Sequence, residues 1–233
     1  MMYPFIILCG GLATRLGPIA AETPKCLLEV NNKPFLYYQL KHLEKSGAQD
    51  VYLSVGHLSE KFYDFIKNYK FKNISIKLVE DGPSRLGTGG AVKNIIKRID
   101  SPTFVMYGDS FLRVNFLDVC NSYKENLGPL IVIYKNDDRY DKSNVYFDGD
   151  NIIYNKTNPS HLSDHIDYGI GIYKYSDFEN TIKSFDLSLI QERFSKFKKL
   201  QYFEAKKRFY EIGTPESYKK VEAFFKKNED KQV

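Results

Sequence analysis

Two glycines followed by two spaced cations form the stretch of this sequence best suited to chemistry. Gly10 and Gly11 follow the apolar run 5–8, and Arg15 and Lys25 come shortly afterwards. Glycine lets the backbone approach phosphate oxygens without side-chain interference, arginine can hold two such oxygens with its planar fork, and lysine adds a mobile point charge. The pattern therefore predicts a cradle for a nucleoside triphosphate, whereas the glycine pair alone would indicate only an ordinary turn.

The position of this loop supports that interpretation, although it fits neither of two familiar nucleotide loops. A P-loop needs Gly-Lys-Ser/Thr, and a dinucleotide-binding loop needs a third glycine that opens a helix. The apolar run before the glycines is typical of a buried parallel strand. The loop is thus expected at the carboxyl end of a strand, where open α/β sheets bind ligands.

Two carboxylates far apart in the sequence are candidate ligands for a divalent cation. Asp109 comes directly after the apolar run 104–107, and Glu211 precedes the helix-starting segment 213–216. Mg²⁺ prefers oxygen ligands and commonly uses one or two carboxylates together with substrate phosphates. Taken alone, Asp109 would indicate a turn former or helix cap and Glu211 a surface carboxylate. Together they predict a shared Mg²⁺, since two unpaired carboxylates would repel each other.

Two further features have both a binding and a purely structural interpretation. Residues 86–91, Leu-Gly-Thr-Gly-Gly-Ala, leave room for a flat base against the backbone, or form a tight strand-to-helix connection. Lys156 follows the strand-like run 152–154 and either holds a substrate phosphate or is a solvated lysine.

The elements that must position these residues alternate between strand-like and helix-like patterns as far as residue 126, which predicts a parallel sheet built by βαβ crossovers. Beyond residue 128 the pattern changes to three meander strands, and a last helix, capped by Thr214, runs to about residue 226. We predict an α/β fold with a Rossmann-like mixed, mostly parallel sheet flanked by helices, and a lobe inserted in the second half. The expected strands are 5–8, 51–55, 74–79, 104–107, 130–134, 144–147 and 152–154, and the expected helices are 34–46, 59–69, 87–99 and 215–226.

Composition limits the classes of protein that fit. The chain has 233 residues, 42% of them hydrophobic, and a net charge of +5 that is spread along its length. We predict one domain over residues 1–226, with halves at about 1–127 and 128–226, and a flexible tail at 227–233. Dispersed lysines favour an anionic small molecule over nucleic acid. Three cysteines without a CxxC pattern argue against disulfides and zinc, and the early glycines interrupt any signal or membrane segment, so a cytoplasmic protein is expected.

These motifs resemble those of the sugar-1-phosphate nucleotidyltransferases over almost the whole chain, from about residue 7 to residue 225. The family's opening pattern, GGxGTRLxP followed by PKxLxxVxxKP, corresponds here to residues 10–18 and 24–34, with Ala13 at a position where many relatives have glycine. The chain is most similar to the bacterial D-glycero-D-manno-heptose-1-phosphate guanylyltransferases, judged by its length, its LGTGGA turn and its ending RFYEIGTPES.

The resemblance implies a set of functional residues. Asn155 and Lys156 align with the family's Glu-Lys pair, which touches the sugar and its phosphate. The catalytic residues would be Arg15, Lys25, Asp109, Lys156 and Glu211, with Mg²⁺ held by Asp109 and Glu211. The nucleotide would contact Leu8, Gly10, Gly11, Asp81, Leu86, Gly87 and Thr88. The sugar phosphate would contact Asn144, Asn155, Lys156, Asp167 and Gly169.

The resemblance also implies a reaction. A phosphate oxygen of a sugar 1-phosphate would attack the α-phosphorus of a nucleoside triphosphate, releasing pyrophosphate and forming a nucleotide sugar, with GDP-D-glycero-D-manno-heptose or a related precursor as the expected product. One alternative is a cytidylyltransferase for phosphocholine or a similar small phosphate. Another is a non-catalytic subunit that senses nucleotide sugars. Monomer and homodimer both remain open.

Overall fold

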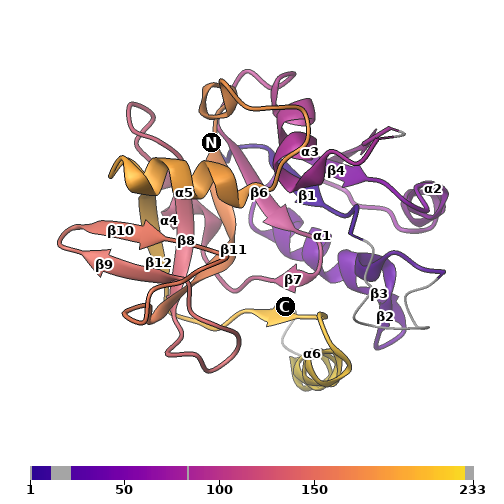
Figure 1. Ribbon diagram of the computed structural model, residues 1–233. Coiled ribbons are helices and arrows are strands. Elements are labelled where there is room, and N and C mark those ends of the chain that lie inside the picture. Colours follow the sequence, from indigo (N-terminus) through magenta and orange to yellow (C-terminus); the bar gives the residue numbers. More distant parts are fainter. Residues whose placement is uncertain (1, 12–21, 83, 229–233) are drawn as a thin grey trace.

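The computed structural model describes residues 2–11, 22–82 and 84–228, and its central feature is a nine-stranded sheet (Figure 1). The strand order is β10-β9-β11-β6-β1-β4-β5, and β8 pairs with both β11 and β12. The strands of this sheet are β1 (Phe5–Leu8), β4 (Asp50–Val55), β5 (Ser75–Glu80), β6 (Thr103–Tyr107), β8 (Leu130–Lys135), β9 (Val145–Asp148), β10 (Asn151–Tyr154), β11 (His165–Tyr173) and β12 (Gln201–Ala205).

Helices cover both faces of the sheet, as the sequence predicted. The core on one face joins β1 to α1, α2 and α4, and the core on the other face joins β1 to α3 and α5. Within β1, Phe5 and Ile7 point to the first core and Ile6 to the second, and all three are fully buried. This explains why the strand is continuously apolar. The helices are α1 (Phe35–Lys45), α2 (Glu60–Asn68), α3 (Gly87–Ile96), α4 (Phe116–Ser122) and α5 (Ser188–Lys196), with 3₁₀ turns η2 (Lys25–Leu27) and η3 (Tyr175–Phe178).

The first half follows the predicted crossover pattern closely. Strands β6, β1, β4 and β5 are mutually parallel neighbours. Their carboxyl ends therefore meet at one edge of the sheet. The helix expected at 59–69 is α2, and Ser59, the residue before its first turn, makes no capping hydrogen bond with its side chain.

The second half differs from the predicted meander. Strands β9 and β10 form the expected hairpin, and its turn consists of Gly149, whose φ is +59°, and Asp150. The meander was wrong for β8, because this strand pairs with β11 and β12 and not with β9. Strand β11 was not predicted, and it joins the two halves by pairing antiparallel with β6. Its sequence conceals it, because Asp167 and two glycines interrupt the apolar pattern.

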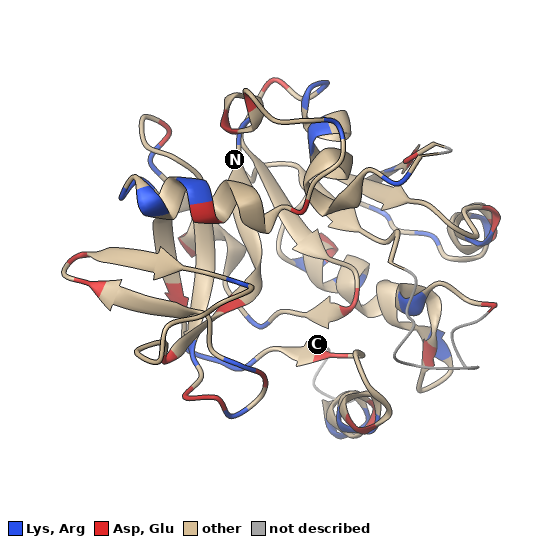
Figure 2. Cartoon of the chain, viewed as in Figure 1, with Lys and Arg blue, Asp and Glu red and all other residues tan. Residues whose placement is uncertain are grey.

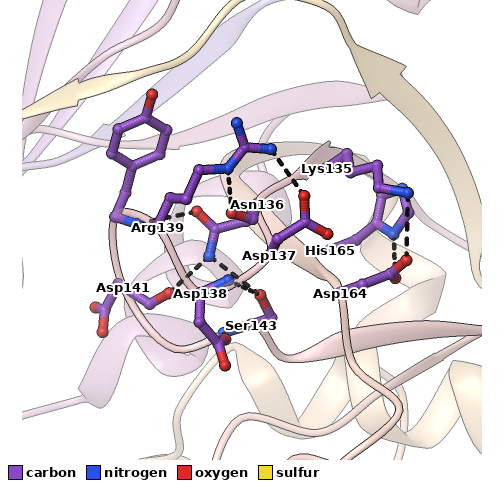
Figure 3. Close-up of polar contacts among 10 residues, drawn as sticks. Lys135, Asn136, Asp137, Asp138, Arg139, Asp141, Ser143, Asp164 and His165 are labelled. Atoms are coloured by element: carbon purple, nitrogen blue, oxygen red, sulfur yellow. Dashed lines mark hydrogen bonds and ion pairs between the residues drawn. The ribbon is translucent and has the colours of Figure 1, made fainter.

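A compact loop connects β8 to β9 and is held by its own polar groups (Figure 3). The buried Asn136 amide donates to the carbonyl of Asp141 at 2.6 Å and to the hydroxyl of Ser143 at 3.1 Å. The Asp138 carboxylate accepts from the Ser143 backbone at 2.7 Å. These bonds fix the loop that leads into Asn144, a predicted sugar-contacting residue.

The carboxyl-terminal segment anchors a second, smaller structure below the sheet (Figure 1). Helix α6 begins where predicted, since the Thr214 hydroxyl accepts from the Ser217 backbone at 3.2 Å. It continues through Asn228, so Lys227 is helical and not part of a tail as predicted. Phe225 packs against Phe35 and Phe111. The remaining elements are β2 (Glu29–Val30), β3 (Lys33–Pro34), β7 (Ser110–Phe111), β13 (Tyr210–Glu211) and α6 (Pro215–Asn228).

Charged residues of both signs are interspersed over the described part of the chain (Figure 2). Among the helices described, none combines the length and the apolar character needed to cross a bilayer.

His42 makes the stability of the fold depend on pH. Burial and, to a lesser extent, the positive charge of Lys45 lower its pKa to about 4, although a hydrogen bond at Leu112 acts in the opposite direction. As the pH falls, His42 therefore becomes protonated near pH 6.5 in the unfolded chain but only near pH 4 in the folded chain. Wild type should lose stability relative to His42→Gln as pH falls from about 6.5 to about 4, by up to about 1.4 kcal/mol per pH unit.

Urea unfolding between pH 7 and pH 4 measures this effect. His161→Gln is the control, since His161 lies at an exposed position. If the unfolding free energies of wild type and His42→Gln fell in parallel with decreasing pH, protonation of His42 would not cause the loss of stability in acid.

Candidate functional site

A cavity of about 600 Å³ opens at the carboxyl ends of β1, β4, β5 and β6. Its size is typical of a small-molecule site. It collects the predicted nucleotide residues into one place although they come from four separate parts of the sequence. Those that line it are Leu8, Gly10, Gly11, Lys25, Asp81, Leu86, Gly87, Thr88 and Asp109.

The glycine loop after β1 lies against the loops that follow β4 and β5. A β-carbon on Gly10 would be 3.1 Å from the Asp81 carboxylate and 3.6 Å from the backbone nitrogen of Gly56. The Ser54 hydroxyl donates to the other Asp81 oxygen at 2.9 Å. Burial raises the pKa of Asp81, and the bond from Ser54 opposes that rise. A carboxylate acceptor is therefore fixed in the wall of the cavity.

Lys25 and Asp109 form an ion pair in this cavity. The ammonium nitrogen lies 2.6 Å from a carboxylate oxygen, and the two side chains are 14% and 31% exposed. Gly108 permits this arrangement, because a β-carbon there would be 2.8 Å from the Leu8 carbonyl oxygen. Each charge thus has a partner that a bound phosphate or cation can replace.

Glu211 reaches the same region through a backbone pairing. Strand β13 runs antiparallel to β7, with Glu211 opposite Ser110, and the Ile212 amide donates to the Asp109 carbonyl at 3.0 Å. Residues opposite each other in a ladder project to the same face. The Ser110 hydroxyl in turn donates to the Asp109 carboxylate at 3.2 Å. The structure therefore brings the backbones of the two predicted metal ligands to neighbouring positions.

The donor chemistry of this pair fits Mg²⁺. Both residues offer carboxylate oxygens, the ligand type that a hard cation prefers. In the ranges that the structure describes, His, Cys, Asp and Glu do not form a group of three or more suited to holding a metal ion. Asp109 and Glu211 would therefore hold the ion together with oxygens of the substrate.

The glycine-rich first turn of α3 packs tightly against residues 181–187 from the second half. The backbones of Gly89 and Leu86 exchange hydrogen bonds with Phe185 at 2.9 Å each. A β-carbon at Gly87, Gly89 or Gly90 would collide with this segment, and Gly87 has a φ of +67°. These positions thus require glycine because of their contact with residues 183–185, and Leu86, Gly87 and Thr88 also line the cavity.

The predicted sugar-phosphate residues belong to the second half, and among them Gly169 lies close to Tyr107, which lines the cavity. Lys156 forms an ion pair with Asp186 at 3.0 Å, at the start of α5. The side-chain oxygen of Asn155 accepts from the backbone of residues 157 and 158, so it stabilises its own loop. Gly169 lies near the first half of the chain, since a β-carbon there would be 3.4 Å from the Tyr107 ring and 3.9 Å from the Ser110 hydroxyl.

Asp167 is the most perturbed carboxylate in this region. Burial raises its pKa to about 6, while bonds from the Gly169 amide at 2.9 Å and the Gln191 amide at 3.0 Å oppose the rise. Its own amide donates to Asn144 at 2.9 Å. A carboxylate held in this way is a ready acceptor for sugar hydroxyl groups.

Sequence reasoning missed several residues that line the cavity, among them Ser54, His57, Arg85 and Tyr107. The signal for Ser54 and His57 was present, because both lie at the end of a strand that was correctly predicted. Arg15 and Ala13 lie outside the described residues, so the structure does not place the predicted second phosphate cation.

Comparison with known proteins identifies the family of this chain. The sequence matches the family described as "Nucleotidyl transferase" over residues 5–228. It is 30% identical to a D-glycero-alpha-D-manno-heptose 1-phosphate guanylyltransferase of Aneurinibacillus thermoaerophilus, over 93% of this chain and 96% of the relative. The chain therefore belongs to the nucleotidyl transferase family.

One further relative and two solved structures are also similar to this chain. A Campylobacter jejuni protein of the same name is 38% identical over 128 residues, which span 52% of this chain and 57% of that relative. The crystal structure of HddC from Yersinia pseudotuberculosis superposes with a TM-score of 0.80 at 26% identity, covering 96% of this chain and all of that one. A second structure of HddC, described as complexed with GMP-PN, covers the same share with a TM-score of 0.79.

Gly11 allows binding to be separated from folding. Among the described residues, nothing lies within 4 Å of a β-carbon added at Gly11, so Gly11→Ala should change unfolding free energy by less than about 0.5 kcal/mol. The added methyl group should nevertheless block close approach of phosphates and raise the KM for triphosphate by about tenfold.

Gly108→Ala is the contrasting variant, because its β-carbon meets the Leu8 carbonyl and should cost about 1–3 kcal/mol of stability. Urea unfolding and substrate kinetics measure the two effects. If Gly11→Ala used the triphosphate as well as wild type does, the glycine loop would not be the phosphate cradle.

Proposed function

We propose that this nucleotidyltransferase transfers GMP from GTP to a heptose 1-phosphate, releasing pyrophosphate and forming a GDP-heptose. The observation that carries the proposal is the single cavity where Gly10, Gly11, Lys25 and Asp109 meet, with Glu211 paired beside it. A phosphate cradle, a cation and two carboxylates at one sheet edge are the groups that phosphoryl transfer requires.

The choice of guanine is supported by the Asp81 carboxylate. Guanine presents neighbouring N–H donors at N1 and N2, and an ionised carboxylate is an acceptor that can serve both. The Ser54 hydroxyl orients the Asp81 carboxylate, which lies in the cavity wall beside the turn 86–88. The two sequence relatives described above are named guanylyltransferases, in line with this choice.

The cations divide into two groups that suit two substrates. Lys25 lies in the nucleotide cavity, where it would leave Asp109 to bind the triphosphate and stabilise the departing pyrophosphate. Lys156 lies in the second half, paired with Asp186, and would turn to the phosphate of the sugar. Asp167 and Gly169 would contact the sugar itself, since both lie on β11, which pairs with β6 of the first half.

The reaction needs no general base from the protein. A sugar phosphate already carries an ionised oxygen, so the enzyme has to align it with the α-phosphorus and neutralise charge. Mg²⁺ held by Asp109 and Glu211 would supply further charge neutralisation on the phosphates. Lys25, in the cavity, and Lys156, in the second half, would supply the remainder.

A matrix of four triphosphates against several acceptors tests this proposal. GTP, UTP, dTTP and CTP are each combined with heptose, mannose and glucose 1-phosphates and with phosphocholine, and pyrophosphate release is measured. We expect the highest kcat/KM for GTP with a heptose 1-phosphate. Preference for CTP with phosphocholine would identify the cytidylyltransferase alternative, and no turnover with any pair would favour a sensing subunit.

Asp109→Asn tests the metal role. The variant removes one anionic ligand and should lower kcat by about 100-fold or more with Mg²⁺ present. Triphosphate binding measured without divalent cations should change little, because Lys25 remains in the cavity. Asp64→Asn, at an exposed position of α2, is the matched control. Wild-type turnover in Asp109→Asn would remove this residue from the metal site.

A further inference from the structure

A second cavity, of about 470 Å³, lies on the solvent side of α3. Gly90, Lys93, Asn94 and Lys97 repeat at the spacing of one helical face and form one wall. The other residues that line it are Tyr175, Lys183, Asp81 and Leu86. None of the functions proposed above uses this cavity.

Positive charge dominates its lining. Lys93, Lys97 and Lys183 face the cavity together with a single carboxylate, that of Asp81. Lys93 donates to the carbonyl and hydroxyl oxygens of Thr181 at 3.1 and 2.9 Å. Over the residues whose placement is described, the ion pairs of the chain involve other lysines and arginines and leave these three ammonium groups without a carboxylate partner. Basic positions follow α3 in Figure 2.

The remaining side chains suit an organic phosphate. Ammonium groups bind phosphate as point charges, and three of them match an anion with more than one negative charge. Tyr175 is 48% exposed at the rim and offers both a ring face and a hydroxyl group. Asn94 adds an amide donor and acceptor for hydroxyl groups of a ligand. The volume lies within the range of small-molecule sites.

This cavity shares part of its wall with the nucleotide cavity. Asp81 and Leu86 line both. Gly90 adjoins the turn 86–89, whose backbone is bonded to Phe185, and Lys183 lies two residues before that contact. A ligand that draws Lys97 and Lys183 together would therefore act on the segment that frames the base.

We propose that the cavity formed by α3, Tyr175 and Lys183 binds a small phosphorylated metabolite and that its occupancy changes the affinity of the neighbouring nucleotide cavity. The ligand class is a phosphate ester with at least two negative charges. The change in nucleotide affinity rests on the proposed function, whereas binding of the anion does not.

Isothermal titration with fructose 1,6-bisphosphate and, separately, inorganic tripolyphosphate tests binding. Wild type should bind at least one of the two, and Lys97→Glu combined with Lys183→Glu should weaken that binding by at least about tenfold. The matched control reverses two exposed lysines elsewhere, Lys67→Glu and Lys70→Glu, and should bind as wild type does. Lys97→Gln with Lys183→Gln serves if the charge reversals fail to fold.

Competition distinguishes the two cavities. A non-hydrolysable GTP analogue present at saturation should leave the anion bound. Displacement by the analogue, absence of binding in wild type, or equal binding in the Lys97/Lys183 variants would each overturn the proposal.

Kinetics tests the coupling separately. The anion should change the KM for triphosphate by about threefold or more in wild type and not in the double variant. An unchanged KM in wild type would overturn the coupling. If the chain turns over no substrate at all, the proposed function fails while the binding result stands.

Discussion

A two-residue backbone pairing between β7 and β13 determines where the chemistry of this chain is assembled. It places Glu211 opposite Ser110 and ties Ile212 to Asp109, joining residues about a hundred positions apart. Two carboxylates brought together without a cation would repel each other. The pairing is possible because Asp109 is already neutralised by Lys25 and because α6 packs behind it through Phe225. The core under α6 thus holds β13 against β7.

The same balance of charge recurs through both halves. Two ion pairs illustrate this, one between Lys25 and Asp109 and one between Lys156 and Asp186. In each pair a substrate phosphate can replace the carboxylate as the partner of the lysine. Partly exposed pairs of this kind are worth little to stability, so exchanging a carboxylate for a phosphate costs little. Preformed pairs therefore keep the cations in position before substrate arrives.

The sequence predicted most of the first half and much of the site. The strands at 5–8 and 104–107 were continuous apolar runs, those at 51–55 and 74–79 were mainly apolar, and the edge that they share follows from parallel topology alone. The position of β11 could not be predicted in this way, since Asp167, Gly169 and Gly171 hide its strand pattern and its register depends on contacts with β6 and β8. The ion pairs of Lys25 and Lys156, and the second cavity beside α3, depend on tertiary placement and carry no local signal.

The close fit between the turn 85–90 and the segment 181–187 has a consequence for how such enzymes diversify. Gly87, Gly89 and Gly90 leave no volume for side chains against Phe185 and Lys183, and Ser184 adds a bond to the carbonyl of Arg85. Segment 181–187 of the second half thus fits closely against the turn 85–90, which lines the nucleotide cavity. Chimeras that exchange one substrate half between relatives must therefore exchange these two segments as a unit.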